Sequence, residues 1–223
     1  SQGVIPAGSY TLTGDCVIAA SLRVAAGETV TIDGGGFAVD GDNMYGVFRV
    51  YEGATLNLSN ITIQNGSAMF DGGGVLNFGG TVNIDHAIIT DNASGDAGTL
   101  YNSAGTMSVS NSVIKNNTAP GGAAFINFAT LNIINTTIAF NTNTHPSSST
   151  IVSNQIASVL NLINVTIADN VAGSEILNNG IANFHNSIIS GGCSGTGSYV
   201  DQGGNLENTN TCGLSTGANT DPM

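Results

Sequence analysis

The stretch "DGGGFAVDGDN", residues 33–43, carries the densest group of side chains that could bind a ligand. Asp33, Asp40, Asp42 and Asn43 offer the carboxylate and amide oxygens that Ca²⁺ prefers. The stretch lacks the full spacing of an EF-hand loop, and Gly-Asp-Gly forms turns without any ion. We therefore expect a turn here, with calcium binding as the weaker alternative, and we expect no cofactor.

The chain has three strong bases, Arg23, Arg49 and Lys115, against 15 acidic residues. A lyase that acts on uronate polymers needs such a base beside acids that hold calcium and the substrate carboxylate. The three bases fall in three different repeats, which are defined below. Arg23 and Arg49 are one repeat apart and could bind one carboxylate, but we favour a solvated pair that faces Asp or Glu.

The histidines do not suggest catalysis either. His86, His145 and His185 lie far apart in the chain, whereas the ligands of a zinc site must converge. A glycosidase would need two carboxylates at a set separation. We therefore predict that the protein is not an enzyme.

The composition excludes several partners. A formal net charge of −12 argues against nucleic acid, whose phosphates demand Lys and Arg, and against anionic membrane surfaces. No apolar run reaches the length of a membrane span. Few lysines and many Asn, Ser, Thr and Gly are typical of an exported protein, so we predict secretion to the cell surface or beyond. No signal peptide is visible, and the sequence is compatible with one removed before Ser1.

Three cysteines add a weak signal for the same compartment. Cys193 and Cys212 lie in a tail rich in Gly, Ser and Asn, where a disulfide could hold an irregular end and would imply an oxidising environment. The sequence alone leaves the pairing open. Cys16 is then left over, either as a buried thiol or as a bond to another chain.

These side chains must be placed by a scaffold, and the scaffold is a repeat. An eight-residue phrase such as "INTTIAFN" (residues 134–141) recurs about every 25 residues. Its second position is Asn60, Asn111, Asn135, Asn164 and Asn186, with His86 once in their place. Its fifth position is always isoleucine: Ile63, Ile89, Ile114, Ile138, Ile167 and Ile189.

Two further registers recur at the same spacing. One is an asparagine after a short apolar run: Asn77, Asn102, Asn127, Asn154 and Asn179. The other is a pair of apolar residues separated by one residue, as in Val82 and Ile84 or Leu131 and Ile133. Each repeat thus holds about three strands with period-two alternation, each followed by residues that favour turns. No stretch has helical spacing.

This pattern predicts an all-β, single-domain, right-handed parallel β-helix with about 25 residues per coil. Stacked coils place equivalent residues roughly 4.8 Å apart. The isoleucines would then form a core ladder, and the asparagines of the phrase would form a ladder of amides at a bend. For this asparagine ladder we favour stabilisation of the turn over ligand binding.

The repeat also divides the chain. Residues 1–21 are predicted to be an N-terminal strand and cap, residues 22–195 the coils, and residues 196–223 an irregular C-terminal coil or cap. The stretch "NTHPSSS", residues 143–149, is the clearest insertion and is predicted to be an exposed loop.

The phrases "NTTIAFN" and "GGGVLNFGGTVNI" are similar to those of bacterial secreted right-handed parallel β-helix proteins in the pectate-lyase-like superfamily. The tail, residues 186–222, resembles the C-terminal part of β-helix proteins with a choice-of-anchor domain, where a Cys pair and "NTDP" follow the last coil. The resemblance covers about residues 22–222 and implies the fold more than a function, because most members are uncharacterised surface proteins. Relatives continue toward an anchor after "NTDP", so we expect a protein without one.

The superfamily contains hydrolases that use clustered aspartates, a Gly-His-Gly string and a basic motif, none of which occurs here. We instead predict a non-catalytic structural protein that joins copies of itself head to tail into a filament or surface layer, because open strand edges template addition. The joint is predicted in Val4 to Ala20, with Val4, Ile5, Tyr10 and Cys16, since this segment lies outside the regular repeat and must cover an end.

The alternative is a carbohydrate-binding surface adhesin, with a polysaccharide lyase or hydrolase less favoured. Five tyrosines could stack on sugars: Tyr10, Tyr45, Tyr51, Tyr101 and Tyr199. An aromatic content of 6% without tryptophan weighs against this alternative.

Overall fold

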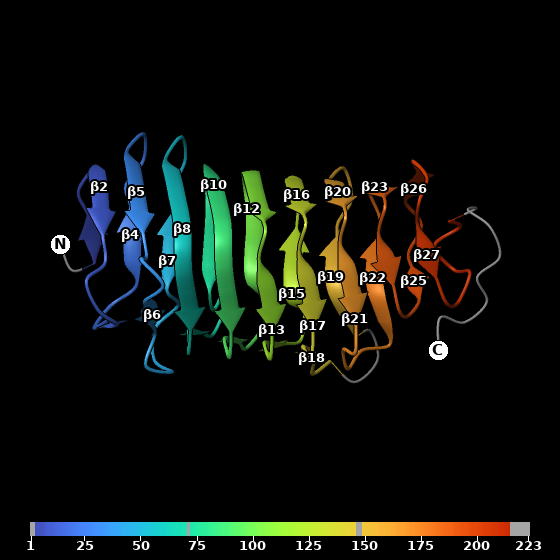
Figure 1. Cartoon of the computed structure of the whole chain (residues 1–223), viewed down its shortest axis with the longest axis horizontal. Helices are drawn as coiled ribbons and strands as arrows, with labels where there is room; N and C mark the ends of the chain where they lie inside the picture. Colours follow the sequence, from blue (N-terminus) through green and yellow to red (C-terminus); the bar gives the residue numbers. More distant parts are fainter. Residues whose placement is uncertain (1–2, 71, 146–148, 215–223) are drawn as a thin grey trace.

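The computed structural model describes residues 3–70, 72–145 and 149–214. These residues form strands and turns without any helix. They wind into a parallel β-solenoid with about 25 residues per turn, as the repeat predicts. Figure 1 shows the coils side by side along the long axis, with the two ends of the chain at opposite ends of the molecule.

Three lines of parallel strands run the length of the solenoid. The first line is β1 (Val4–Ile5), β4 (Leu22–Val24), β7 (Phe48–Val50), the start of β10 (Val75–Thr90), the start of β12 (Gly98–Ser110), β15 (Gly122–Asn127), β19 (Thr150–Asn154), β22 (Ser174–Asn178) and β25 (Cys193–Ser194). The second line is β2 (Gly8–Thr11), β5 (Thr29–Asp33), β8 (Thr55–Gln64), the middle of β10, the end of β12, β16 (Thr130–Ile134), β20 (Val159–Ile163), β23 (Ile181–His185) and β26 (Ser198–Asp201).

The third line is β3 (Cys16–Val17), β6 (Ala38–Asp40), the end of β8, the end of β10, β13 (Val113–Lys115), β17 (Thr137–Ala139), β21 (Thr166–Ala168), β24 (Ile188–Ile189) and β27 (Leu206–Glu207). A short four-stranded sheet follows this line at one corner and comprises β9 (Ser67–Ala68), β11 (Ala93–Ser94), β14 (Thr118–Ala119) and β18 (Thr142–Asn143).

The isoleucine column lies inside the third line. All six isoleucines have a relative exposure of 0% and pair with one another from coil to coil: Ile63, Ile89, Ile114, Ile138, Ile167 and Ile189. The column continues through Val39 to Cys16 at one end and ends at Glu207 at the other. The repeating phrase therefore builds the core, except at its terminal positions.

The asparagines of the phrase occupy a bend in the left-handed backbone region. Their φ angles lie between 49° and 55°, and the φ of His86 is 51°. Asn and His tolerate this region better than most side chains, which explains why the position repeats. Their side chains are exposed, and Asn164 Nδ2 donates to Asn135 Oδ1 at 2.9 Å. The amide ladder is interrupted where His86 bonds to Asp85 instead.

A further asparagine ladder is buried. Its members all have an exposure of 0% and are joined by amide hydrogen bonds of 2.7–2.9 Å: Asn77, Asn102, Asn127, Asn154 and Asn178. The sequence predicts Asn179 as the last member of this ladder. That prediction is wrong by one residue, because Asn154 pairs with Asn178. In the sequence "LNN", residues 177–179, both asparagines fit the spacing. Only the pairing with the preceding coil shows that Asn178 is the ladder residue.

We expect Asn127→Ala to destabilise the fold more than Asn135→Ala. Asn127 donates to Asn154 Oδ1 and two backbone carbonyls, so its removal leaves several buried groups without a partner and should cost about 3 kcal/mol. Asn135 is exposed, and its loss should cost about 1 kcal/mol through the φ preference and two solvent-exposed ladder bonds. Urea denaturation of both variants checks this order, and equal losses would contradict it.

The N-terminal segment does not lie across the end of the solenoid. Val4 pairs with Arg23, Gly8 with Val30 and Cys16 with Val39, all in parallel register. The expectation that Val4 to Ala20 stands outside the regular repeat is therefore wrong, because the segment forms a short first coil. The strands of this coil are short and contain no asparagine, so the repeating eight-residue phrase cannot be recognised in its sequence. The predicted exposed loop at residues 143–149 is wrong at Asn143, which is buried in β18, and residues 146–148 lie outside the described residues.

Candidate functional site: the two ends of the solenoid

The N-terminal end of the solenoid presents three free strand edges. Within the described residues, β1, β2 and β3 pair on one side only, with β4, β5 and β6. Leu12 N donates to Asp33 O, so the alternation of a strand directs the N–H groups of Ser9 and Thr11 toward the open side. Such an edge can template the addition of another strand.

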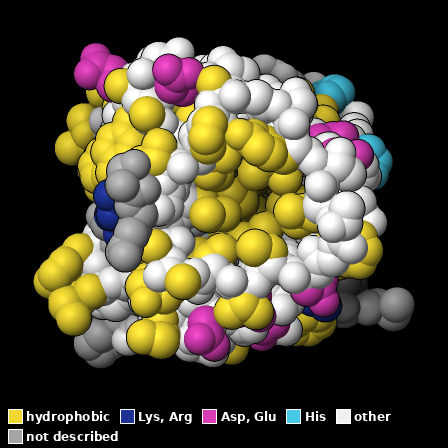
Figure 2. Space-filling view, turned by 90° about the vertical axis from the view of Figure 1, so that its left-hand side faces the viewer, with side chains coloured by type: hydrophobic (Ala, Val, Ile, Leu, Met, Phe, Trp, Pro, Cys, Tyr) yellow, Lys and Arg dark blue, Asp and Glu magenta, His cyan; other side chains and the backbone are white. Residues whose placement is uncertain are grey.

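This end is also hollow and apolar. Figure 2 shows hydrophobic side chains around a depression in the end face. A hollow of about 390 Å³ at this end is lined by Gly3, Cys16, Val17, Ile18, Ala19, Ala20 and Leu22. Gly3 has a φ of 81°, and a Cβ there would approach Ser21 O to 2.2 Å. The β1–β4 register places Gly3 opposite Leu22, so no side chain of β1 covers Leu22, which stays partly exposed.

The residues predicted for a joint all lie in this first coil. Val4 is 41% exposed and Tyr10 38% exposed, while Ile5 is half-buried. Cys16 is a partly exposed free thiol that lines the hollow. The structure therefore places the four residues in one coil at the N-terminal end, where Cys16 lines the hollow.

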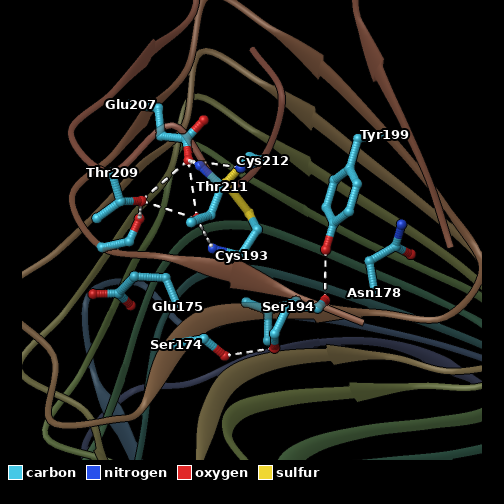
Figure 3. The surroundings of a disulfide bond; sticks show 12 residues. Ser174, Glu175, Asn178, Cys193, Ser194, Tyr199, Glu207, Thr209, Thr211 and Cys212 are labelled. Carbon is cyan, nitrogen blue, oxygen red and sulfur yellow. Dashed lines mark hydrogen bonds between the residues drawn. A yellow bond between two sulfur atoms is a disulfide. The ribbon is translucent and has the colours of Figure 1, made fainter. Parts of the chain in front are cut away.

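The C-terminal end is built differently. Cys193 and Cys212 form a disulfide with a Cα–Cα distance of 4.9 Å, which holds the stapled segment, residues 208–214, against β25 (Figure 3). Cys193 N donates to Thr211 Oγ1 at 2.7 Å. The segment buries Cys212 and Leu214 in the core. Within the described residues, β26 and β27 pair only with β23 and β24, so their outer edges carry no strand.

Glu207 closes the isoleucine column at this end. Its Oε1 accepts hydrogen bonds from the backbone N–H groups of Thr211 and Cys212 and from the Thr209 hydroxyl (Figure 3). Its Oε2 is buried without a hydrogen-bond partner. Sequence reasoning did not single out Glu207, because the residue stands in a tail that lacks the full phrase.

Glu175 is a second buried carboxyl that the sequence did not reveal. It is 5% exposed and accepts a hydrogen bond from Asn170 Nδ2 at 3.0 Å. Asn170 is the partly exposed end of another asparagine ladder, whose other members, Asn92, Asn117 and Asn141, are buried. Burial raises the pKa of Glu175 to about 7, with the charge of Asp169 adding to the rise and the Asn170 bond opposing it.

The calcium candidate does not form one group. Asp33 accepts from Gly35 N and Asn60 Nδ2 at one bend, while Asp40 accepts from Asp42 N, Gln64 and Asn65 at the next. Burial acts to raise the pKa of Asp40, but these three bonds outweigh it and leave the pKa below its ordinary value. Asp42 and Asn43 are turn residues with φ near 55°. Within residues 3–70, 72–145 and 149–214, no three His, Cys, Asp or Glu side chains are grouped to hold a metal ion.

The strong bases are placed as their spacing predicts. Arg23 and Arg49 are direct partners in the β4–β7 ladder, whereas Lys115 lies in the third line, several coils away. His86, His145 and His185 lie on three separate coils.

In the part of the chain that the structure describes, no helix is long and apolar enough to span a membrane. Comparison with family models, curated proteins and solved structures finds no match to this chain.

Proposed function

We propose that this protein is a non-catalytic structural protein that joins copies of itself end to end into an extracellular filament or surface layer. The observation that carries the proposal is the N-terminal end, where the free edges of β2 and β3 lie beside an apolar hollow. An open apolar end gains from being covered, because burial of apolar surface is the main favourable term in association. The unpaired edges supply direction and register.

The two ends are suited to a heterologous contact. Two hollow ends placed face to face would enclose a void, and the atoms around a void lose their dispersion contacts. The C-terminal end instead offers the stapled segment with its buried Leu214, and the free edges of β26 and β27. The stapled segment lies at the end of the first strand line, where β1 of the next subunit would otherwise be placed. β1 is held to β4 by only two residue pairs, so we expect the stapled segment to displace it at the joint.

The contact would repeat along one axis. A heterologous contact that does not close into a ring produces an open filament. The strand lines continue through such a joint in the parallel sense, because β2 would lie on β26 and β3 on β27.

A location outside the cell agrees with the composition and the tail. The Cys193–Cys212 disulfide is typical of an oxidising compartment. The resemblance of the tail to secreted bacterial β-helix proteins points the same way. Charged side chains make up only 8% of the chain, so the net charge of −12 is spread thinly along the coils.

We expect Val17→Lys to abolish assembly and leave the monomer folded. Val17 is 65% exposed at the rim of the hollow and pairs with Asp40, so a lysine is tolerated in the monomer but would be desolvated in the joint. Val171→Lys is the matched control, because Val171 is 62% exposed on the bend after β21, in the seventh of nine coils and outside the faces of both ends. Sedimentation velocity of the three proteins at equal concentration measures the loss. Equal sedimentation of Val17→Lys and wild-type polymers would exclude the N-terminal end as the joint.

A further inference from the structure

The link between β24 and β25 packs on the buried side chain of Glu175. We call this link the glycine strap, residues 190–192, because it contains Gly191 and Gly192. Glu175 N donates to Gly192 O at 2.7 Å. Gly191 has a φ of 149°, and a Cβ there would collide with Cγ of Glu175. The strap therefore leaves no space above the Glu175 side chain, which is 5% exposed.

The glycine strap is also bonded to the stapled segment. Gly191 N donates to Asn208 Oδ1 at 2.9 Å, and Thr209 Oγ1 donates to Gly191 O at 3.1 Å. Cys193, the residue after the strap, is joined to Cys212 by the disulfide (Figure 3). A movement of the strap that admits water to the buried carboxyl must therefore shift the stapled segment as well.

The surroundings of Glu175 oppose a charge on its carboxyl. The β19–β22 register places the fully buried Ile151 opposite Glu175. The strap and the stapled segment carry no titratable side chain outside the disulfide. Among the described residues, the charge that acts on Glu175 is the like charge of Asp169, and the carboxylate is favoured by the hydrogen bond from Asn170. A carboxylate here would therefore gain from contact with water.

The pH window of this effect follows from linkage. The pKa of Glu175 is about 7 while the strap is closed, against an ordinary value of 4.5 for a carboxyl that reaches water. Between these two values the closed state binds more protons than the open state, so the cost of opening falls as pH rises through the window and is constant above it. The equilibrium constant for opening should therefore rise about tenfold between pH 6 and pH 8.

We propose that Glu175 is a pH switch for the C-terminal end of the solenoid: its neutral form lets the glycine strap and the stapled segment close, and its charged form loosens both. This inference rests on the proposed end-to-end assembly, in which the stapled segment meets the hollow end of the next subunit. A loosened segment must be ordered again before it can be buried in the joint, and this ordering costs free energy. Filaments should therefore form more readily at pH 6 than at pH 8.

Hydrogen exchange measured by mass spectrometry tests the switch in dilute, monomeric protein. The N–H groups of Gly191, Cys193 and Cys212 are all bonded in the closed state. After correction for the intrinsic effect of pH on amide exchange, peptides containing them should exchange about tenfold faster at pH 8 than at pH 6. Glu175→Gln should remove this difference. Glu28→Gln, which removes an exposed carboxyl, is the matched control and should behave as wild type does.

Sedimentation velocity at the same two pH values measures the effect on assembly. Wild-type polymers should diminish at pH 8, whereas those of Glu175→Gln should be equal at both pH values. Equal exchange at the two pH values in wild type, or the same pH effect in Glu175→Gln, would overturn the switch even if polymers form. Faster exchange near Val171 but not near Cys212 would also overturn it, because the carboxyl would then reach water past Asn170. The expected exchange without polymers at either pH would support the loosening and overturn end-to-end assembly.

Discussion

Ile138→Asp is expected to lower the free energy of unfolding by about 5 kcal/mol. Ile138 has an exposure of 0% and lies between Ile114 and Ile167 in the core column. An aspartate there meets apolar neighbours above and below, so it must either lose its hydration as a charge or take up a proton. Both outcomes also remove the packing contacts of the isoleucine side chain.

Thr137→Asp is the matched control for this substitution. Thr137 is the adjacent residue on the same strand but faces the solvent, so the same new side chain should change stability by less than about 0.5 kcal/mol. Chemical denaturation of both variants measures the difference. Similar losses in the two variants would mean that the inward column has been misassigned.

Glu175→Gln is expected to stabilise the protein by about 3 kcal/mol at pH 8 and by little at pH 4. The pKa of Glu175 is raised from 4.5 to about 7 in the folded state, chiefly by burial. Between these two values the folded state binds more protons than the unfolded state, so folding stability falls as pH rises through this window. Above pH 7 the penalty is fully present, because the buried carboxylate must be charged. Glutamine carries no charge and can still accept the hydrogen bond from Asn170.

The difference between variant and wild type isolates this group from the other acids of the chain. Denaturation at pH 4, 6 and 8 should show the gap between the two proteins opening with pH. Glu28→Gln removes an exposed carboxyl and should give a gap below about 0.5 kcal/mol at every pH. A gap that stays constant for Glu175→Gln would show that Glu175 titrates as an ordinary surface carboxyl.

The sequence predicts the middle of this molecule well because every coil repeats the same physical problem. Ile114 and Ile138 recur at one spacing because both fill the same core position, and Asn111 and Asn135 recur because both occupy the same left-handed bend. Register could therefore be assigned from spacing alone. The error at Asn179 arose where two adjacent asparagines satisfy the same pattern, and three-dimensional pairing was needed to choose between them.

The ends were less predictable because they follow no repeat. Cys16 occupies the core column at the first coil and Glu207 at the last, and neither resembles the isoleucines between them. Glu175 reaches the end of an asparagine ladder from another strand, which no local spacing reveals. The stacking of Tyr51 on Phe78 was also missed, since the two residues are distant in sequence and meet only when neighbouring coils stack.

Electron microscopy of the negatively stained wild-type protein at high concentration tests end-to-end assembly most directly. Each strand line holds nine strand positions, so stacked subunits should form unbranched filaments with an axial repeat of about 43 Å at roughly 4.8 Å per coil. Filaments of one-subunit width with this repeat, absent from Val17→Lys, are the result we predict. Single particles of monomer length at every concentration would contradict it.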